Sequence, residues 1–342
     1  MNKELLIQTA KAMVAPGKGL IAADESSPTC AKRFESVGVP CTEETRRAYR
    51  EVLLGAEGLE QYVSGVILFD ETIRQSAADG TLFPELLVRK GIIPGIKVDG
   101  GAKELALHAG EKITEGLDGL RERLAEYFAL GARFAKWRAV ITIGPDMPSR
   151  ACIHANAHAL ARYAALCQEA GIVPILEPEV LIDGDHSLER SYEVSVATLK
   201  KLFDEIADQD VLLEGAILKA SMVIAGKGAV KQSTPTEVAD ATVKCLLENV
   251  PKDLAGVVFL SGGQGDEQAT ANLNAMNQKT GLPWPLSFSY SRAIQNPVLK
   301  VWAQNPATNS GKARDALMFR CKMNSLAAQG KYSDDMEKER PY

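Results

Sequence analysis

The chain is poor in histidine, and this limits the metal centres it could hold. Only four histidines occur, although imidazole is the commonest metal ligand in proteins. His154 and His158 would share one face of a helix, but no H-E-x-x-H motif accompanies them. We therefore interpret them as a surface or core-edge pair, and we expect neither a metal nor any other cofactor.

The cysteine pattern and the hydropathy limit where the protein works. No two of the six cysteines form a C-x-x-C pair, which is typical of reduced thiols in a cytosol-like compartment. The first residues, MNKELLIQTAKAM, lack the apolar core of a signal peptide. No stretch approaches the ~18 uninterrupted apolar residues of a membrane-spanning helix. The sequence thus predicts a cytoplasmic protein with no membrane partner.

The chain also lacks an excess of positive charge. Its formal net charge is −5, with 46% hydrophobic and 24% charged residues, which is ordinary for a globular protein. Nothing in this balance attracts nucleic acid, so we expect no nucleic-acid partner. Any bound anion must be held by a local cluster of basic residues.

Short apolar segments recur along the whole chain, separated by helical patterns at intervals of roughly 30 to 45 residues, as in βαβ units. The segments are 19–25, 64–70, 93–99, 132–140, 171–180, 212–222, 256–263 and 285–292. Eight such units predict a (β/α)8 barrel, the TIM-barrel fold, which needs about 250 residues. The surplus predicts an N-terminal helix, insertions and a C-terminal tail.

We expect residues 1–342 to form a single barrel domain. The last stretch, 331–342 (KYSDDMEKERPY), is polar and is expected to be a mobile tail. The rival fold is an open, doubly wound sheet. That fold usually has a G-x-G-x-x-G turn after its first strand, and the sequence AADESSP does not provide one.

Lys219 is the residue from which the chemistry can be inferred. It follows the apolar run 212–218 (LLEGAIL), which we interpret as a strand buried on both faces. A lysine at the end of such a strand is costly unless it is paired or gives up its proton. A neutral lysine amine can condense with a carbonyl to form a Schiff base. The alternative is a lysine whose amine reaches solvent.

Polar residues gather at the ends of the other predicted strands, where the active face of such a barrel lies. K-x-R at Lys136 and Arg138, and E-x-E at Glu177 and Glu179, each place two side chains on one strand face. These pairs on adjacent strands are expected to line one cavity. Further candidates are Asp24, Glu25, Lys97, Asp99, Ser261, Gly262, Gly263, Ser289 and Arg292.

The surplus of basic residues in this set suits phosphate. The run 260–265 (LSGGQG) could present backbone N–H groups to an anion at the start of a helix. Phosphate sites after the seventh and eighth strands recur in this fold. The two GKG segments, 17–19 and 226–228, do not fit the frame of a Walker loop.

At these residues the chain resembles the class I, Schiff-base fructose-1,6-bisphosphate aldolases over nearly its whole length. Similar segments follow one another in order and at the family's spacing. They are APGKG (15–19), AADES (22–26), GVILF (65–69), GIKVD (95–99), FAKWR (134–138), GIVP (171–174), EPE (177–179), DGDH (183–186), LEGAILK (213–219), FLSGGQ (259–264), FSY (288–290) and QGKY (329–332).

The resemblance implies roles for five catalytic residues. Lys219 would form the Schiff base with C2 of the ketose. Glu177 would act as acid and base during dehydration of the carbinolamine, and Glu179 would position both Glu177 and Lys219. Lys136 would stabilise charge and help to keep the Lys219 amine neutral. Asp24 would take the proton of the C4 hydroxyl as the C3–C4 bond breaks.

The resemblance also implies where the two phosphates lie. Arg292, Ser261 and the Gly262 amide would hold the C1 phosphate, with Ser289 beside them. Lys97, Arg138 and Ser26 would lie at the C6-phosphate side. The terminal Tyr342 matches the tail tyrosine that assists proton exchange at the enamine carbon. The family resemblance further implies phosphorylated ketose and triose substrates and a homotetramer.

Some positions depart from the family pattern. Ala220-Ser221 follow the lysine where Pro-Asn or Pro-Ser is frequent, and Ser291 replaces a glycine beside the phosphate arginine. The tail after Tyr332 is also shorter than in animal members. Two alternatives stay open: another Schiff-base barrel enzyme, such as a transaldolase, or a non-catalytic scaffold that kept the fold. A preference between fructose 1,6-bisphosphate and fructose 1-phosphate does not follow from the residues.

Overall fold

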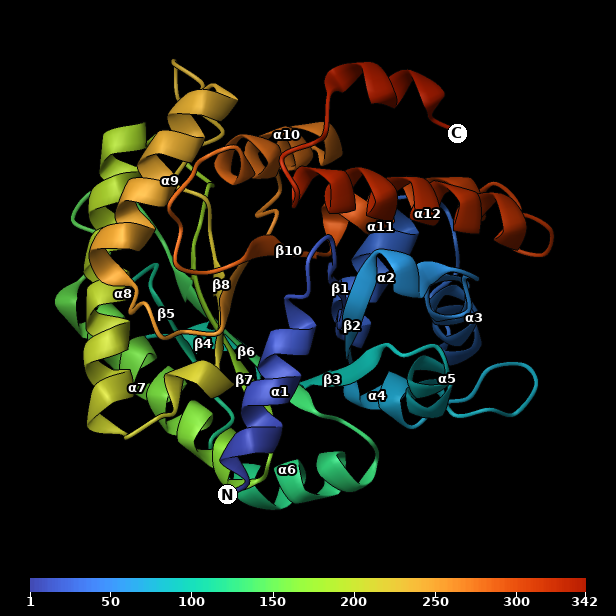
Figure 1. The fold of residues 1–342 in the computed structure, drawn as a ribbon, viewed down its shortest axis with the longest axis horizontal. Coiled ribbons are helices and arrows are strands. Elements are labelled where there is room, and N and C mark those ends of the chain that lie inside the picture. The colour runs from blue at the N-terminus through green and yellow to red at the C-terminus, as the bar shows by residue number, and fades with distance from the viewer.

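The computed structural model describes residues 1–342 and contains a closed barrel of eight parallel strands (Figure 1). Around the barrel the strands follow the order β1, β10, β9, β8, β7, β6, β3, β2. Their bounds are β1 Gly19–Ala23, β2 Val63–Leu68, β3 Ile93–Lys97, β6 Phe134–Ile141, β7 Val173–Val180, β8 Ile217–Ala220, β9 Gly256–Phe259 and β10 Leu286–Tyr290. The predicted (β/α)8 barrel is confirmed, and each predicted segment overlaps one of its strands, with β2 and β6 extending one residue beyond their segments.

Helices surround the strands, and the predicted N-terminal helix, α1 (Lys3–Met13), precedes the first of them. The other helices are α2 Ser27–Glu35, α3 Glu43–Leu54, α4 Asp70–Ile73, α5 Phe83–Arg89, α6 Leu120–Ala129, α7 Arg150–Glu169, α8 Leu188–Asp208, α9 Pro235–Asn249, α10 Asp266–Asn277, α11 Arg292–Ala303 and α12 Ser310–Ala327. Short 3-10 helices are η1 Leu59–Gln61, η2 Leu213–Gly215 and η3 Asp334–Glu339.

Alternation along the strands divides the interior of the barrel into an apolar half and a charged half. Residues two apart on a strand point to the same side. On β7, Val173 and Ile175 belong to the apolar core inside the barrel, and Glu177 and Glu179 follow them on the same side. β6 and β8 follow the same order, with Phe134 before Lys136 and Ile217 before Lys219.

Helix α1 closes the apolar end of the barrel. Leu6 packs into the same core cluster as Phe134, the first residue of β6. Gly95 on β3 makes room for the Phe134 ring, since a Cβ at Gly95 would lie 2.2 Å from the ring. The barrel can therefore be open only at the carboxyl ends of its strands.

Two details differ from the predicted elements. The strand expected over 212–218 begins only at Ile217, because Leu213–Gly215 forms η2. A Cβ on Gly215 would lie 3.0 Å from that of Leu6, so the close packing of α1 shapes this turn. An antiparallel hairpin, β4 (Ala102–Glu104) and β5 (Lys112–Thr114), follows β3 and was not predicted. Its first strand is fully exposed and has no apolar alternation to reveal it.

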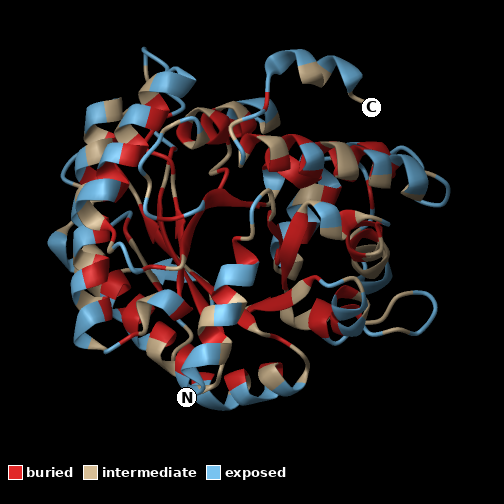
Figure 2. Cartoon of the chain, in the orientation of Figure 1, coloured by how far each residue is buried: buried red, intermediate tan, exposed pale blue.

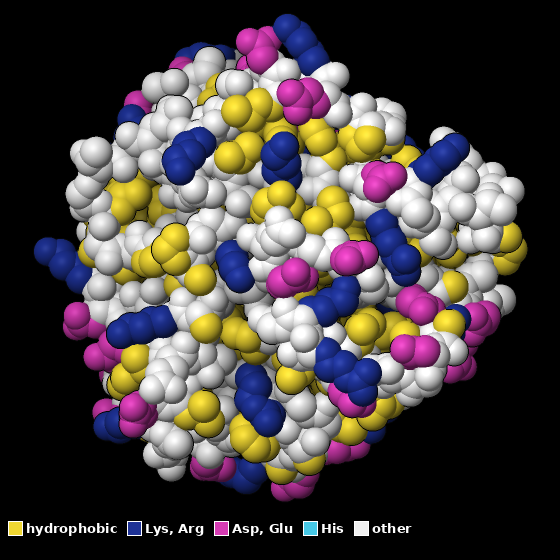
Figure 3. Space-filling model, turned by 45° about the vertical axis from the view of Figure 1, so that its right-hand side comes forward, with side chains coloured by type: hydrophobic (Ala, Val, Ile, Leu, Met, Phe, Trp, Pro, Cys, Tyr) yellow, Lys and Arg dark blue, Asp and Glu magenta, His cyan; other side chains and the backbone are white.

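Burial follows the layers, with buried strands at the centre and exposed outer faces on the helices (Figure 2). On the face shown in Figure 3, basic and acidic side chains alternate with small apolar areas. None of the helices combines the length and the apolar character that crossing a bilayer would need.

Candidate active site

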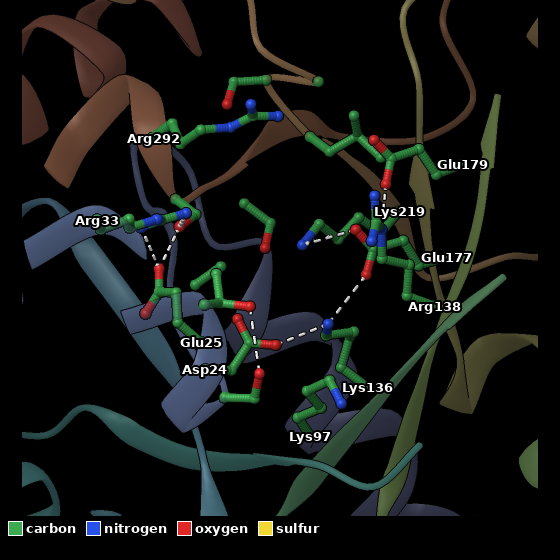
Figure 4. A pocket seen from close by; sticks show the side chains of 18 of the residues that line it. Asp24, Glu25, Arg33, Lys97, Lys136, Arg138, Glu177, Glu179, Lys219 and Arg292 are labelled. Carbon is green, nitrogen blue, oxygen red and sulfur yellow. Dashed lines mark hydrogen bonds and ion pairs between the residues drawn. The ribbon is translucent and has the colours of Figure 1, made fainter. Parts of the chain in front are cut away.

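The carboxyl ends of the strands enclose a cavity of about 510 Å³. Of the further candidates, Glu25 lines it and Asp99 and Gly263 do not; every residue with a predicted role lines it except Tyr342 (Figure 4). These residues are Asp24, Ser26, Lys97, Lys136, Arg138, Glu177, Glu179, Lys219, Ser261, Gly262, Ser289 and Arg292. The alternation that fills the lower barrel with apolar side chains directs this polar set into the cavity.

Lys219 lies at the end of β8 with its side chain only 4% exposed. Its Nζ is 3.1 Å from Oε1 of Glu177, which the neighbouring strand β7 supplies. The other carboxylate oxygen of Glu177, Oε2, is buried and has no hydrogen-bond partner. This oxygen lies 3.4 Å from Lys136 Nζ but accepts no hydrogen bond in the protein, so it can accept one from a substrate atom or a water.

Lys136 lies between two carboxylates. Its Nζ is 2.6 Å from Oδ2 of Asp24 and 3.4 Å from Oε2 of Glu177. Burial by itself opposes ionisation of Asp24, but Lys136 and Lys219 outweigh it and hold the pKa of this carboxyl well below its usual range. Burial likewise opposes protonation of Lys136, but Asp24 and Glu177 raise its pKa above the ordinary value. Lys136 is therefore a fixed cation, and Asp24 is ionised at neutral pH.

Arg138 and Glu179, the second residues of the predicted K-x-R and E-x-E pairs, form an ion pair with each other. The guanidinium of Arg138 donates to the carboxylate of Glu179. Burial tends to lower the pKa of Arg138, but Glu179 and Glu177 raise it above the ordinary value. Lys97 on β3 lies opposite Lys136 in the register and forms an ion pair of 2.7 Å with Asp99. One side of the cavity thus holds three cations, Lys97, Lys136 and Arg138, each paired with a carboxylate.

A different group of residues forms the opposite side, where β9 and β10 end. Gly262 and Gly263 have φ of +58° and +94°, which glycine adopts at little cost. Ser289 Oγ is buried without a hydrogen-bond partner. Arg292, the first residue of α11, has no ion pair with any side chain, and burial lowers its pKa from the ordinary value. This side offers two donors that nothing in the protein occupies.

Basic side chains outnumber acidic ones around the cavity, although the whole chain is acidic. Seven basic and four acidic side chains line it: Lys32, Arg33, Lys97, Lys136, Arg138, Lys219 and Arg292 against Asp24, Glu25, Glu177 and Glu179. A cavity with this balance concentrates anions. The arrangement therefore combines a buried lysine, proton-carrying carboxylates and sites for an anion of more than one charge.

Three residues of the cavity were not predicted from the sequence, namely Lys32, Arg33 and Ser291, and Glu25 was a candidate without a predicted role. Lys32 and Arg33 lie on α2, and Ser291 precedes α11. Arg33 and the Ser291 hydroxyl both bind the buried carboxylate of Glu25. Helix-borne residues do not follow strand alternation. The only available signal was the Lys-Arg pair shortly after the first strand.

Glu25 is anchored from behind by Arg50 of α3, which is 2% exposed and lies 2.6 Å from the carboxylate. Arg50→Met is expected to lower the free energy of unfolding by about 3 kcal/mol, because removing one partner leaves a buried charge underpaired. Arg33 still pairs with Glu25, so we expect a loss at the lower end of what removing one partner of a buried ion pair usually costs. Urea titration of the variant and the wild-type protein measures the difference.

Arg47 of the same helix supplies the matched control. It forms ion pairs with Glu44 and Glu51 at the surface, and its side chain is 22% exposed. Arg47→Met should cost less than about 1 kcal/mol, as exposed pairs usually do. Equal losses in the two variants would contradict an anchoring role for Arg50.

Tyr342 lies outside the cavity that contains Lys219. Its ring packs edge-on against Phe319 at 6.1 Å between centroids, and Arg340 lies over it at 5.1 Å. The tail is held by Arg320, whose guanidinium donates to both carboxylate oxygens of Glu337 at 2.7 Å. Tyr342 lines a neighbouring cavity, and Arg292 borders both cavities.

Known proteins with the same fold and a similar sequence identify the family. The model of the family Fructose-bisphosphate aldolase class-I matches residues 5–341. The chain is 61% identical to a probable fructose-bisphosphate aldolase class 1 of Xanthomonas campestris pv. campestris, with 97% of this chain and 99% of that protein covered. It is 49% identical to the fructose-bisphosphate aldolase of Dictyostelium discoideum, with 96% and 93% covered.

A solved structure agrees with these sequence relatives. The fructose-bisphosphate aldolase of Plasmodium falciparum, determined in complex with TRAP and a small-molecule inhibitor, superposes with a TM-score of 0.95. It is 46% identical, with 96% of this chain and 95% of that chain covered. With this identity over nearly the full length, the chain belongs to the class I fructose-bisphosphate aldolases, lyases of glycolysis and gluconeogenesis that act through a Schiff base and without a metal cofactor.

Proposed function

We propose that the cavity cleaves fructose 1,6-bisphosphate reversibly into dihydroxyacetone phosphate and glyceraldehyde 3-phosphate, with Lys219 as the nucleophile. The observation that carries this assignment is the contact of 3.1 Å between the Lys219 amine and Glu177. A proton passed along this contact leaves a neutral amine and a protonated carboxyl group. The amine can then add to the C2 carbonyl of the ketose.

Glu177 is the acid and base of the dehydration step. Addition of the amine converts the C2 carbonyl oxygen into a hydroxyl group. Glu177 returns its proton to that hydroxyl, which leaves as water while the nitrogen lone pair forms the iminium bond. The Oε2 atom of Glu177, which faces Lys136 but accepts no hydrogen bond in the protein, is available for this exchange. Glu179, tied to Arg138, positions the strand end from which Glu177 projects.

Asp24 accepts the proton of the C4 hydroxyl. The C3–C4 bond pair then moves to C3, the iminium becomes an enamine, and C4 becomes the aldehyde of the released triose. The lowered pKa of Asp24 keeps it ionised and therefore able to accept. Lys136, 2.6 Å away, holds this carboxylate in place and spreads the charge that develops.

Phosphate groups at the two ends of the sugar orient it. Arg292, Ser261, the Gly262 amide and Ser289 are proposed to hold the C1 phosphate, since Arg292 and Ser289 have no competing partners. Lys97, Arg138 and Ser26 are proposed to lie at the C6 phosphate, where Lys97 and Arg138 are held by carboxylates. Phosphate is bound well by such charge-assisted donors.

Four further proposals follow from the sequence pattern and from the family resemblance. Residues 1–342 form a single domain, whose tail, 331–342, moves so that Tyr342 reaches the enamine carbon. Arg292 borders both cavities, which gives the tail a short path. The protein is a homotetramer. It works in the cytoplasm, in agreement with six free cysteines; some relatives are chloroplastic, among them one from Oryza sativa.

The substrate preference tests the proposed phosphate sites. We expect kcat/KM for fructose 1,6-bisphosphate to exceed that for fructose 1-phosphate by roughly ten- to hundredfold, because each charge-assisted contact contributes about 1.5–3 kcal/mol. Steady-state cleavage in the presence of EDTA measures both values. EDTA should leave them unchanged. Equal values for the two sugars, or loss of activity in EDTA, would contradict the proposal.

A further inference from the structure

The GKG loop, 226–228, lies beside the proposed C1-phosphate site. This loop follows β8, and its backbone is fixed to the loop after β7. Lys227 N donates to Ile182 O at 2.8 Å, and Gly228 N donates to Gly184 O at 2.8 Å. A Cβ at Gly226 would lie 2.4 Å from Gly184 O, so only glycine permits this approach. The position of the Lys227 backbone is therefore well defined.

The side chain of Lys227 reaches the glycines at the end of β9. A Cβ placed on Gly263 would lie 2.6 Å from Lys227 Nζ and 3.2 Å from each terminal nitrogen of Arg292. Lys227 and Arg292 thus flank the same point of the proposed phosphate-binding loop. Gly263 also has a φ of +94°, so both the backbone and the two cations exclude a side chain there.

Lys227 has one weak partner. Its Nζ lies 3.2 Å from Oδ1 of Asp183, and both side chains are largely open to solvent, at 45% and 67% exposed. Exposed pairs of this kind contribute little, with a median of about 0–1 kcal/mol. A phosphate with more charge than one carboxylate would compete well for the lysine.

The C1 phosphate needs more than one positive charge. A phosphate monoester carries about −1.5 to −2 charges at neutral pH. Among the basic residues that line the cavity, Arg292 and the exposed Lys32 of α2 form no ion pair, whereas Arg33 is bound to Glu25. We propose that Lys227 is the second cation of this site, which leaves Asp183 for the C1 phosphate of the substrate and thereby sets the affinity for it.

This assignment rests on the proposed function. It predicts different effects on the binding of the two triose phosphates. In the condensation direction, dihydroxyacetone phosphate supplies the C1 phosphate and glyceraldehyde 3-phosphate supplies the C6 phosphate. Lys227→Met should raise the KM for dihydroxyacetone phosphate by about five- to twentyfold. The KM for glyceraldehyde 3-phosphate and kcat should stay within about twofold, because Lys227 takes no part in the proton transfers.

The control is Lys231→Met in the same loop. Lys231 is 83% exposed and forms an ion pair with Glu237, away from the cavity, so its loss should leave both KM values unchanged. Lys227→Arg should restore the KM for dihydroxyacetone phosphate, and Asp183→Asn should lower it. These measurements need steady-state condensation assays of four variants and the wild-type protein.

Three outcomes would overturn the role of Lys227. They are an unchanged KM for dihydroxyacetone phosphate in Lys227→Met, an equal rise of both KM values, or the same effect in Lys231→Met. Failure of the proposed function is a different result, since the wild-type protein itself would then catalyse no condensation. Circular dichroism of each variant shows that the fold is kept.

Discussion

Lys219→Met is expected to lower kcat for cleavage of fructose 1,6-bisphosphate by about 10⁴-fold or more, the order of effect seen when a nucleophile is removed. Without the amine, no covalent bond forms to C2, and no electron sink exists for the C3–C4 bond pair. Methionine fills the buried space, and Lys136 remains 3.4 Å from Glu177. The fold should therefore persist. A coupled steady-state cleavage assay measures the loss of kcat.

Lys219→Arg distinguishes the nucleophile from the charge. Arginine keeps a cation beside Glu177 but does not form a Schiff base under these conditions. Its kcat should fall as far as that of Lys219→Met. Activity close to wild type in Lys219→Arg would mean that Lys219 acts only as a charge. Activity close to wild type in Lys219→Met would mean that the lysine is not required, and either result would contradict the mechanism. Thermal unfolding followed by circular dichroism shows whether both variants are folded.

Glu177→Gln has the second largest expected effect. The amide has nearly the same shape as the carboxyl group but carries no transferable acidic proton. We expect kcat to fall by about 10²–10⁴-fold, the usual contribution of a positioned acid or base. The KM should change little, because no phosphate contact is lost. The rate at which borohydride traps the imine should fall as well, since formation of the imine itself requires the acid.

Glu111→Gln is the matched control for Glu177→Gln. Glu111 is also a buried carboxylate, at 3% exposed, but it accepts the Ser149 N–H at the start of α7, outside the cavity. Its substitution should leave kcat and the trapping rate within about twofold of wild type. If Glu177→Gln behaved like Glu111→Gln, the acid would have to be another group.

The barrel could be predicted because apolar strand segments alternate with helical patterns along the whole chain. Eight apolar segments at βαβ spacing leave few other topologies. The start of β8 could not be predicted, since the 3-10 turn at Leu213–Gly215 depends on the packing of Leu6 from a distant helix. The hairpin of β4 and β5 was missed because its exposed strand carries no hydrophobic pattern.

The core of the site could also be predicted, again from alternation. Residues two apart on β6 and β7 point into one cavity, which brings Lys136, Glu177 and Lys219 together. Residues from helices and loops follow no such rule. Arg33 enters from α2, and Lys227 reaches Gly263 from a loop whose path is set by backbone contacts with the loop after β7. The sequence pattern of 226–228 excluded a Walker loop but could not indicate what Lys227 faces.

The central claim is that Lys219 binds the substrate covalently. Treating the wild-type protein with dihydroxyacetone phosphate and sodium borohydride, followed by peptide mass spectrometry, tests it most directly. We predict one reduced adduct per chain, on the peptide containing Lys219, and none when borohydride is added without substrate. An adduct on Lys136, Lys227 or any other lysine, or no adduct at all while cleavage proceeds, would contradict the account.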